Sequence, residues 1–377
     1  MSLWDTIHGQ AGAVTYLRQA IRKERVVSAY LFAGPEGAGK TLTASVFARA
    51  LNCQPAPGEG CGSCPDCREI AGGSHPDVHF LSPASKSRRI VIDQLRDLLR
   101  LVHLQTRRDS WKVCVIEEAD RMNESAQNAF LKTLEEPPER TVLILVTPQP
   151  GELFPTIRSR CQRVSFVPWT FGMMRPFLSE KTGLSEDESR VLHRISGGCP
   201  GRALRLFRGG ILETRKKVVG PLVEGRFASA REVIARAEAW LDYLAERSRA
   251  LREELDGRRA EWGEALGPPQ LKALEEQDNA AVAAGERAEL DLIFELIFSW
   301  IRDLFVCRSA GGEAPLINGD LADRIAAASR RRTPAQLRRM LEWVGKSRDW
   351  AVKAGGRAAR QLILENMLIQ LGYWQPR

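Results

Sequence analysis

Apolar positions in the first 168 residues follow two alternating patterns. Short, nearly continuous apolar runs are typical of strands buried in a parallel sheet, and they lie at SAYLFAG (28–34), KVCVIEE (112–118) and TVLILVT (141–147). Amphipathic patterns with helical spacing occupy 11–23, 40–52, 92–104 and 123–136. The regular succession of strand and helix predicts a doubly wound α/β domain, a parallel sheet with helices on both faces.

The strand pattern ends at Pro168. Residues 169–208 predict a small helical domain, and the rest of the chain, 209–377, is almost wholly helical in pattern. Within it, apolar residues spaced three and four apart over 231–262, a Gly-Pro-Pro turn at 267–269 and a second apolar helix over 270–307 predict a long hairpin at about 228–307. Further helices are expected near 320–330, 334–353 and 357–372.

Composition and charge narrow the class of protein. The 377 residues are 44% hydrophobic and 27% charged, with a net charge of +8, which describes a soluble globular chain. The most apolar long segment, 290–307, carries charges at helical spacing and therefore predicts a core helix rather than a membrane span. The opening MSLWDTIHGQ has no secretory pattern. We expect a cytoplasmic protein whose eight cysteines do not form a disulfide framework.

The stretch GPEGAGKT (34–41) fits the phosphate-binding loop G-x-x-x-x-G-K-[ST] in full. It follows a predicted strand and opens a predicted helix, as the mechanism requires. Its glycines Gly34, Gly37 and Gly39 would let backbone N–H groups surround the phosphates. Lys40 would reach the β- and γ-phosphates, and Thr41 would place its hydroxyl on Mg²⁺. The loop alone does not separate a kinase from an ATPase.

Two carboxylates follow the second apolar strand, in VCVIEEAD (113–120). In NTPases with such a loop, the first acid holds Mg²⁺ and the next polarises the attacking water. These roles would fall to Glu117 and Glu118. The alternative is a pair of surface acids that end a strand.

Four cysteines form C-x7-C-x2-C-x2-C: Cys53, Cys61, Cys64 and Cys67. This spacing is typical of four thiolates that converge on one zinc ion, and four sulfurs leave no position open for water. We therefore predict a structural zinc module at 53–67. A redox-active pair is the alternative interpretation.

The stretch FPTIRSRCQRVSF (154–166) places Arg160 on a turn after the last predicted strand. An arginine there could cross a subunit boundary and stabilise phosphoryl transfer in a neighbour. Taken alone, the stretch favours the alternative interpretation, a solvated surface arginine.

Together these residues resemble the AAA+ clamp-loader subunits of bacterial DNA polymerase III. The matching features are GPEGAGKT, the four cysteines, the run NAFLKTLEEPPERTVLILVT and RSRC. The resemblance is close over 4–208 and looser over the helical remainder. It implies an AAA+ P-loop NTPase domain over 1–168, a small helical lid over 169–208 and an all-α collar for oligomerisation over 209–377.

Two branches of this family compete, the γ/τ motor subunits and the δ′ subunits. The opening LWDTIHGQ, the segment ELIFSWIRDLFVC and the ending RQLILENMLIQLGYW resemble δ′. Gly201 stands at the sensor-2 arginine of motor subunits, and Arg202 lies one residue later, about 100° around a helix. Thr147 matches the first sensor-1 residue, but Pro148 replaces the second.

Other positions bear on catalysis in the same comparison. Glu117 stands where motor subunits have aspartate, while Ser159-Arg160-Cys161 matches the arginine-finger motif in full. The resemblance implies a δ′-like subunit that binds ATP and lends Arg160 to a γ-type neighbour. Whether its own site, with Glu118, hydrolyses ATP stays open.

The resemblance also implies partners. These are clamp-loader subunits of γ/τ and δ type in a hetero-pentamer, the sliding clamp and primer–template DNA, with ATP, Mg²⁺ and Zn²⁺ as cofactors. Basic clusters at 86–89, 107–108 and 330–332 could contact DNA phosphates. The alternatives are a γ/τ-type motor that hydrolyses ATP at its own site and, less in keeping with the helical C-terminal part, a small-molecule kinase.

Overall fold

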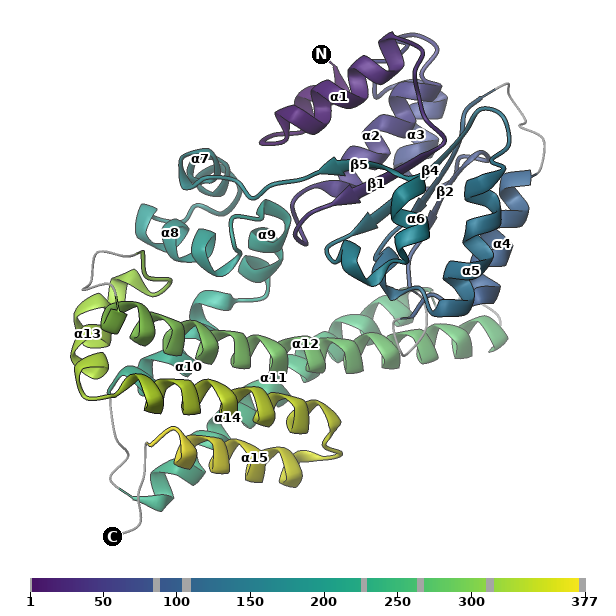
Figure 1. Ribbon diagram of the computed structural model, residues 1–377. Coiled ribbons are helices and arrows are strands. Elements are labelled where there is room, and N and C mark those ends of the chain that lie inside the picture. Colours follow the sequence, from purple (N-terminus) through teal and green to yellow (C-terminus); the bar gives the residue numbers. More distant parts are fainter. Residues whose placement is uncertain are drawn as a thin grey trace. The chain divides into compact units, whose positions relative to one another are not determined.

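The computed structural model describes residues 2–83, 89–103, 110–224, 229–262, 268–309 and 315–372. It forms two compact units (Figure 1), one from Met1–Leu184 and Ser196–Arg205, the other from Ser185–Ile195 and Leu206–Arg377. Residues 169–208, predicted as one small helical domain, are thus divided between the units. Most of the basic residues at 86–89 and 107–108, and Gly267 of the predicted turn, lie outside the described residues.

The first unit is built on a five-stranded sheet in the order β2-β3-β4-β1-β5, in which every pairing is parallel. The strands are β1 (Ala29–Ala33), β2 (Val78–Leu81), β3 (Lys112–Ile116), β4 (Thr141–Thr147) and β5 (Gln162–Ser165). Side chains of β1, β3 and β4 are buried throughout, as their apolar runs predict. Because the strands are parallel, the loops that follow β1, β3 and β4 meet at one edge of the sheet.

Two of these strands are absent from the sequence prediction. β2 and β5 lie at the two edges of the sheet, are four residues long, and carry polar or half-exposed side chains that break the apolar pattern. The prediction that Arg160 follows the last strand on a turn is therefore wrong. Arg160 ends helix α6 (Pro155–Arg160), and β5 comes after it.

Helices cover both faces of the sheet, which confirms the predicted α/β architecture. One core lies between the sheet and α1 (Ala11–Arg22), α2 (Lys40–Asn52) and α3 (Pro65–Ala71), with Tyr30, Phe32 and Phe47 fully buried. The other lies between the sheet, α4 (Ile92–His103), α5 (Glu124–Glu135) and α6. The same unit holds α7 (Phe171–Thr182), most of α9 (Pro200–Arg208) and the 3₁₀ turns η1 (Leu3–Thr6), η2 (Ala119–Arg121) and η3 (Pro150–Glu152).

The second unit is helical. Its elements are α8 (Glu186–Ile195), α10 (Ile211–Glu224), α11 (Ala230–Trp262), α12 (Pro268–Ser309), η4 (Gly319–Leu321), α13 (Ala322–Arg330), α14 (Pro334–Lys353) and α15 (Arg357–Gln370). The two long helices α11 and α12 pack together as the predicted hairpin, and α12 also packs on α10, α13 and α14. Among the described residues, no helix combines the length and apolarity that a membrane crossing needs.

Candidate nucleotide site and metal centre

Residues 34–41 lead from β1 into α2, which begins at Lys40. Gly37 (φ 78°) and Gly39 (φ 97°) have left-handed backbone conformations that glycine adopts without strain. A Cβ at Gly37 would also lie 2.3 Å from the backbone nitrogen of Arg202. The two glycines therefore shape a tight loop beneath the open N-terminus of α2, where backbone N–H groups and the helix dipole favour an anion.

Lys40 is 6% exposed and lies inside this loop. Its ammonium donates hydrogen bonds to the backbone oxygens of Gly34 (2.6 Å) and Pro35 (2.7 Å). Burial lowers the pKa of Lys40, against the opposing pull of nearby acidic groups such as Glu36 and Asp120. A buried ammonium is costly without a negative partner. A phosphate oxygen would therefore compete with the two backbone carbonyls for the hydrogen bonds of Lys40.

The acidic residues after β3 lie at the same edge of the sheet as this loop, although β4 separates β3 from β1. The carboxylate of Glu117 accepts a hydrogen bond from the Ser82 hydroxyl. Glu118 has a left-handed backbone (φ 47°) and pairs with Arg121. This edge of the sheet therefore carries two carboxylates in addition to Lys40. Each carboxylate already has a partner, Ser82 for Glu117 and Arg121 for Glu118.

Thr147 ends β4 and is fully buried. Its hydroxyl donates to Asp120 Oδ1 (2.6 Å) and accepts from the Gln149 backbone N–H (2.9 Å). Thr147 therefore positions Asp120, whose carboxylate belongs to the pocket wall described next.

These groups surround a cavity of about 630 Å³ in the first unit. Predicted site residues line it together, namely Gly37, Gly39, Lys40, Thr41, Glu117 and Glu118. Gly34 and Thr147 are not among its lining residues, although each contacts one of them. The size matches that of pockets that enclose small ligands.

The far side of the cavity is apolar and was not predicted from the sequence. Ile7, His8, Trp169, Phe177 and Leu204 line it. The Trp169 ring lies edge-on to both His8 (centroids 6.2 Å apart) and Phe177 (5.4 Å). Aromatic side chains in the same cavity as a phosphate loop form a wall that can accommodate the flat base of a nucleotide.

Gln10 holds this wall against the loop. Its side-chain amide donates to the backbone oxygens of Ala38 (3.2 Å) and Val167 (2.7 Å), and its carbonyl accepts from the Val167 N–H (3.0 Å). Asp120 belongs to the stretch VCVIEEAD (113–120), but roles were predicted only for its first two acids. Arg205 and the apolar residues were missed because they come from separate segments that no local motif marks, and only the fold brings them together.

Arg160 lies outside this cavity. It is at the C-terminal end of α6, with its side chain 39% exposed. The guanidinium pairs with Glu135 Oε1 (2.8 Å) and donates to the Thr156 carbonyl (3.1 Å). The structure therefore does not bring Arg160 together with Glu117, Glu118 or Lys40 of the same chain.

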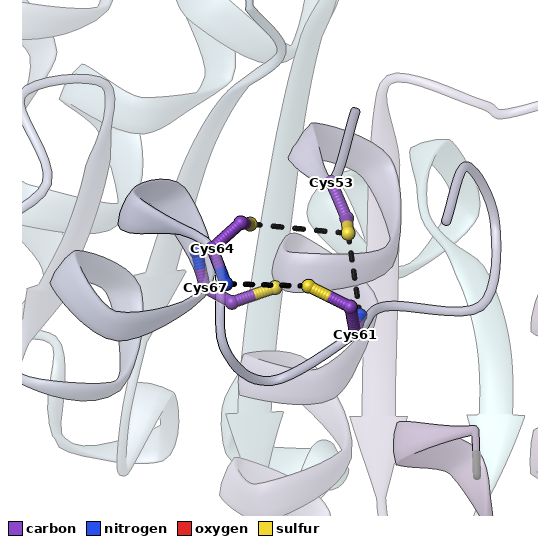
Figure 2. Close-up of side chains that lie close together, drawn as sticks. All are labelled: Cys53, Cys61, Cys64 and Cys67. Carbon is purple, nitrogen blue, oxygen red and sulfur yellow. Dashed lines mark hydrogen bonds between the residues drawn. The ribbon is translucent and has the colours of Figure 1, made fainter. Parts of the chain in front are cut away.

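The four cysteines converge on one point between α2 and α3 (Figure 2). Cys53 ends α2 and Cys64 caps the start of α3, and all four sulfurs lie within 4.8 Å of one another. None is in a disulfide. Backbone N–H groups donate to the sulfurs of Cys53 (3.2 Å), Cys61 (3.3 Å) and Cys64 (3.4 Å).

These contacts suit a metal ion that thiolates bind. Backbone N–H donors from Ser63 and Cys64 lower the pKa of Cys61 to about 6, which favours the thiolate. Burial raises the pKa of Cys53 and brings that of Cys67 to about 12, so these two sulfurs would be costly to ionise without a cation. Four closely placed sulfurs with N–H···S support fit a tetrahedral site without an open position.

The amino-acid sequence of this chain is similar to subunits of DNA polymerase III. The family model described as "DNA polymerase III, delta subunit" matches residues 9–170. The chain is 38% identical over 217 residues to DNA polymerase III subunit delta' of Pseudomonas aeruginosa, covering 56% of this chain and 65% of the relative. It is 40% identical over 222 residues to subunit tau of Bacillus subtilis, covering 56% and 39%.

Two further proteins are similar to this chain in sequence or in structure. Subunit delta' of Escherichia coli is 33% identical over 181 residues, covering 48% of this chain and 54% of that subunit. A solved gamma subunit-related protein of Thermotoga maritima is 19% identical, with a TM-score of 0.42 and coverage of 95% and 98%. The matched region thus spans less than two thirds of these curated relatives, 65%, 39% and 54% of their lengths.

Proposed function

We propose that the chain acts as a δ′-like subunit of a clamp loader, because the family model for DNA polymerase III subunits matches residues 9–170 and the similar curated proteins include three delta' subunits. In this proposal it joins γ/τ-type and δ-type subunits in a hetero-pentamer. The assembly uses ATP to place a sliding clamp on primer–template DNA. The chain contributes a nucleotide pocket of its own and one arginine to a neighbour.

The position of Arg160 carries the proposal. Its guanidinium is exposed, lies outside the chain's own pocket, and is held at the end of a short helix by Glu135 and by the Thr156 carbonyl. A cation fixed in this way can enter an adjacent subunit's site and stabilise charge that develops on a transferred phosphoryl group. The ion pair with Glu135 is at the surface, so its loss upon docking would cost little.

The pocket of this chain suits ATP. The loop N–H groups and Lys40 would bind the β- and γ-phosphates, and the aromatic wall at Trp169 would hold the base. Thr41 and Glu117 would hold a Mg²⁺ ion, which would supply positive charge beside the phosphates. Thr147, through Asp120, keeps the polar side of the pocket in place.

Hydrolysis at this site depends on Glu118. A general base needs a free carboxylate directed at the attacking water, but Glu118 is turned by its left-handed backbone and paired with Arg121. We therefore propose a subunit that binds ATP and turns it over slowly or not at all. The second candidate is a γ/τ-type motor, which the 40% identity to the Bacillus subtilis tau subunit favours.

The four cysteines would hold a structural Zn²⁺. The ion would tie the end of α2 to the start of α3 and so fix the loop between them. It would take no part in phosphoryl transfer, because four sulfur ligands leave no site for water or substrate.

The decisive experiment is clamp loading by a loader reconstituted with γ-type and δ-type partners. Arg160→Ala should slow DNA-stimulated ATP hydrolysis about 100-fold at the neighbouring site, the order of loss for a removed transition-state cation. Arg158→Ala, two residues away, is the matched control and should keep at least half of the activity. Undiminished loading with Arg160→Ala would reject the proposal.

The two candidates separate in the same assay. Lys40→Ala should leave most of the assembled loader's turnover intact if the chain mainly serves its neighbour. If Lys40→Ala removes that turnover while Arg160→Ala spares it, the chain is a γ/τ-type motor.

A further inference from the structure

Helix α9 meets the phosphate loop backbone to backbone. The Gly201 N–H donates to the Gly37 carbonyl (2.9 Å). A Cβ at Gly201 would lie 3.1 Å from that oxygen and 3.2 Å from Gly37 Cα. A side chain at position 201 would therefore be closer to the loop backbone than ordinary contact, and α9 or the loop would have to shift by a few tenths of an ångström to admit it. The present packing of α9 on the loop thus disfavours an arginine at this position, the residue that motor subunits carry there.

The next turn of α9 presents a cation to the same cavity. Arg205 lies four residues after Gly201, on the same face of the helix, and lines the pocket beside Leu204. Arg202 points about 100° away from position 201 and is not among the lining residues. Among the described arginines, Arg121 and Arg205 face the cavity, and Arg121 is paired with Glu118.

Arg205 has a partner that a ligand can displace. Its guanidinium lies 2.9 Å from Glu36 Oε1, and the two side chains are 61% and 65% exposed. Glu36 belongs to the phosphate loop itself and also lines the cavity. An exposed carboxylate binds a guanidinium weakly, whereas a polyphosphate carries more charge and accepts two parallel hydrogen bonds from it.

We propose that Arg205 binds the polyphosphate of the nucleotide in place of an arginine at position 201, and that Glu36 holds its guanidinium until the nucleotide displaces it. This inference rests on the proposed role of residues 34–41 as a nucleotide site. It assigns to Arg205 the nucleotide-sensing contact of this chain, one helical turn from Gly201.

The test is ATP–Mg²⁺ binding to the full chain by isothermal titration at fixed salt. Arg205→Ala should weaken binding about tenfold, because a charge-assisted contact to phosphate is lost. Arg202→Ala, on the same helix, is the matched control and should stay within about twofold. Unchanged affinity in Arg205→Ala, or an equal loss in Arg202→Ala, would overturn the assignment.

A second measurement tests whether the nucleotide displaces Glu36 from Arg205. Glu36→Gln should tighten ATP binding about threefold, since it frees Arg205 and removes a negative charge near the phosphates. The gain should shrink in the Glu36→Gln, Arg205→Ala double variant. Equal gains in both backgrounds would show that the two residues are not coupled and would reject the exchange.

Failure of the underlying site is distinguishable. If the unaltered chain binds no ATP, or Lys40→Ala binds as well as the unaltered chain, the nucleotide site itself is wrong. If both behave as expected but Arg205→Ala is unaffected, the assignment of Arg205 fails and the nucleotide site stands.

Discussion

Glu59 joins the cysteine-bearing loop to the N-terminal segment. Its carboxylate accepts two hydrogen bonds from Arg18 (2.8 and 2.7 Å), one from Arg22 (2.9 Å) and one from the Ser2 hydroxyl (2.6 Å). The Leu3 N–H also donates to the Glu59 carbonyl (3.2 Å). The hydrogen bonds from Arg18, with those from Ser2 and Arg22, lower the pKa of Glu59 to about 2. Stability of the first unit should therefore depend on this one carboxylate.

We expect Glu59→Gln to lower the free energy of unfolding by about 1 kcal/mol at pH 7, the scale of a partly exposed ionic cluster. Because the folded pKa is depressed, the carboxylate stabilises fully above its ordinary pKa of 4.5 and loses this contribution as the pH falls toward about 2. Urea unfolding midpoints of the two proteins should therefore converge between pH 5 and about 2. Glu139→Gln, at an exposed carboxylate, is the control. A difference independent of pH would contradict the electrostatic origin.

Residues that act together could be predicted only where they are contiguous. GPEGAGKT and the four cysteines are short motifs whose geometry follows from the local chain, so their members were found from sequence. Arg205 reaches the cavity from α9, far along the chain from the phosphate loop, and Asp120, although it follows the predicted Glu117 and Glu118 closely, is positioned by Thr147 at the end of β4. Their positions depend on tertiary packing, which no spacing rule encodes.

At the scale of elements, the cysteine module links two helices. Cys53 is the C-cap residue that directly follows α2, Cys64 is the N-cap of α3, and Cys67 lies in the first turn of α3. Metal bound there would fix 53–67 against the core face that carries Phe47 and Ile70. Without it, partly buried sulfurs would face one another with no compensating charge.

We predict one zinc per chain and its loss in Cys61→Ser. The remaining three sulfurs complete the shell poorly, so affinity should fall at least 100-fold and the thermal midpoint should drop by several degrees. Metal content by atomic emission and the melting temperature with and without chelator measure this. Cys307→Ser, in the second unit, should change neither quantity. A zinc-free chain purified from metal-replete cells would refute the site.

The elements themselves were predicted well where burial is complete and poorly at the sheet edges. Helices over 40–52 and 334–353 match α2 and α14 residue for residue. The phosphate-loop motif marks the start of α2 at Lys40, and the Thr333 cap with Pro334 marks the start of α14. β5 has one buried side chain among four, so its strand pattern is invisible in sequence. It forms because its backbone pairs with β1, and this pairing orders the chain after Arg160.

For the molecule as a whole, the chain forms two compact units of different composition. The first unit contains the cavity lined by the phosphate-loop residues and the cysteine module, and the second is built from long helices. A loader subunit has to stay in its assembly through every nucleotide state. We therefore propose that the second unit supplies assembly, independently of what the pocket holds.

Asp303 offers a way to test this division of tasks. It is fully buried in the second unit and accepts hydrogen bonds from the backbone N–H groups of Ile317 (2.9 Å) and Asn318 (2.7 Å) and from the Asn318 side chain (2.9 Å). Asn318 in turn accepts from Arg215 (2.8 Å), so one carboxylate connects α12 with α10 and with the segment before α13. Removing it would leave several buried donors without an acceptor.

Asp303→Ala should lower the stability of the second unit by about 3 kcal/mol and reduce co-elution with γ-type and δ-type partners, while ATP binding to the isolated chain stays within twofold. Asp323→Ala, an exposed acid on α13, is the control for both measurements. Assembly that persists despite a lowered unfolding midpoint would place the assembly surface elsewhere. Parallel loss of ATP binding would instead show that the first unit, which holds Lys40, depends on the second unit, which holds Asp303.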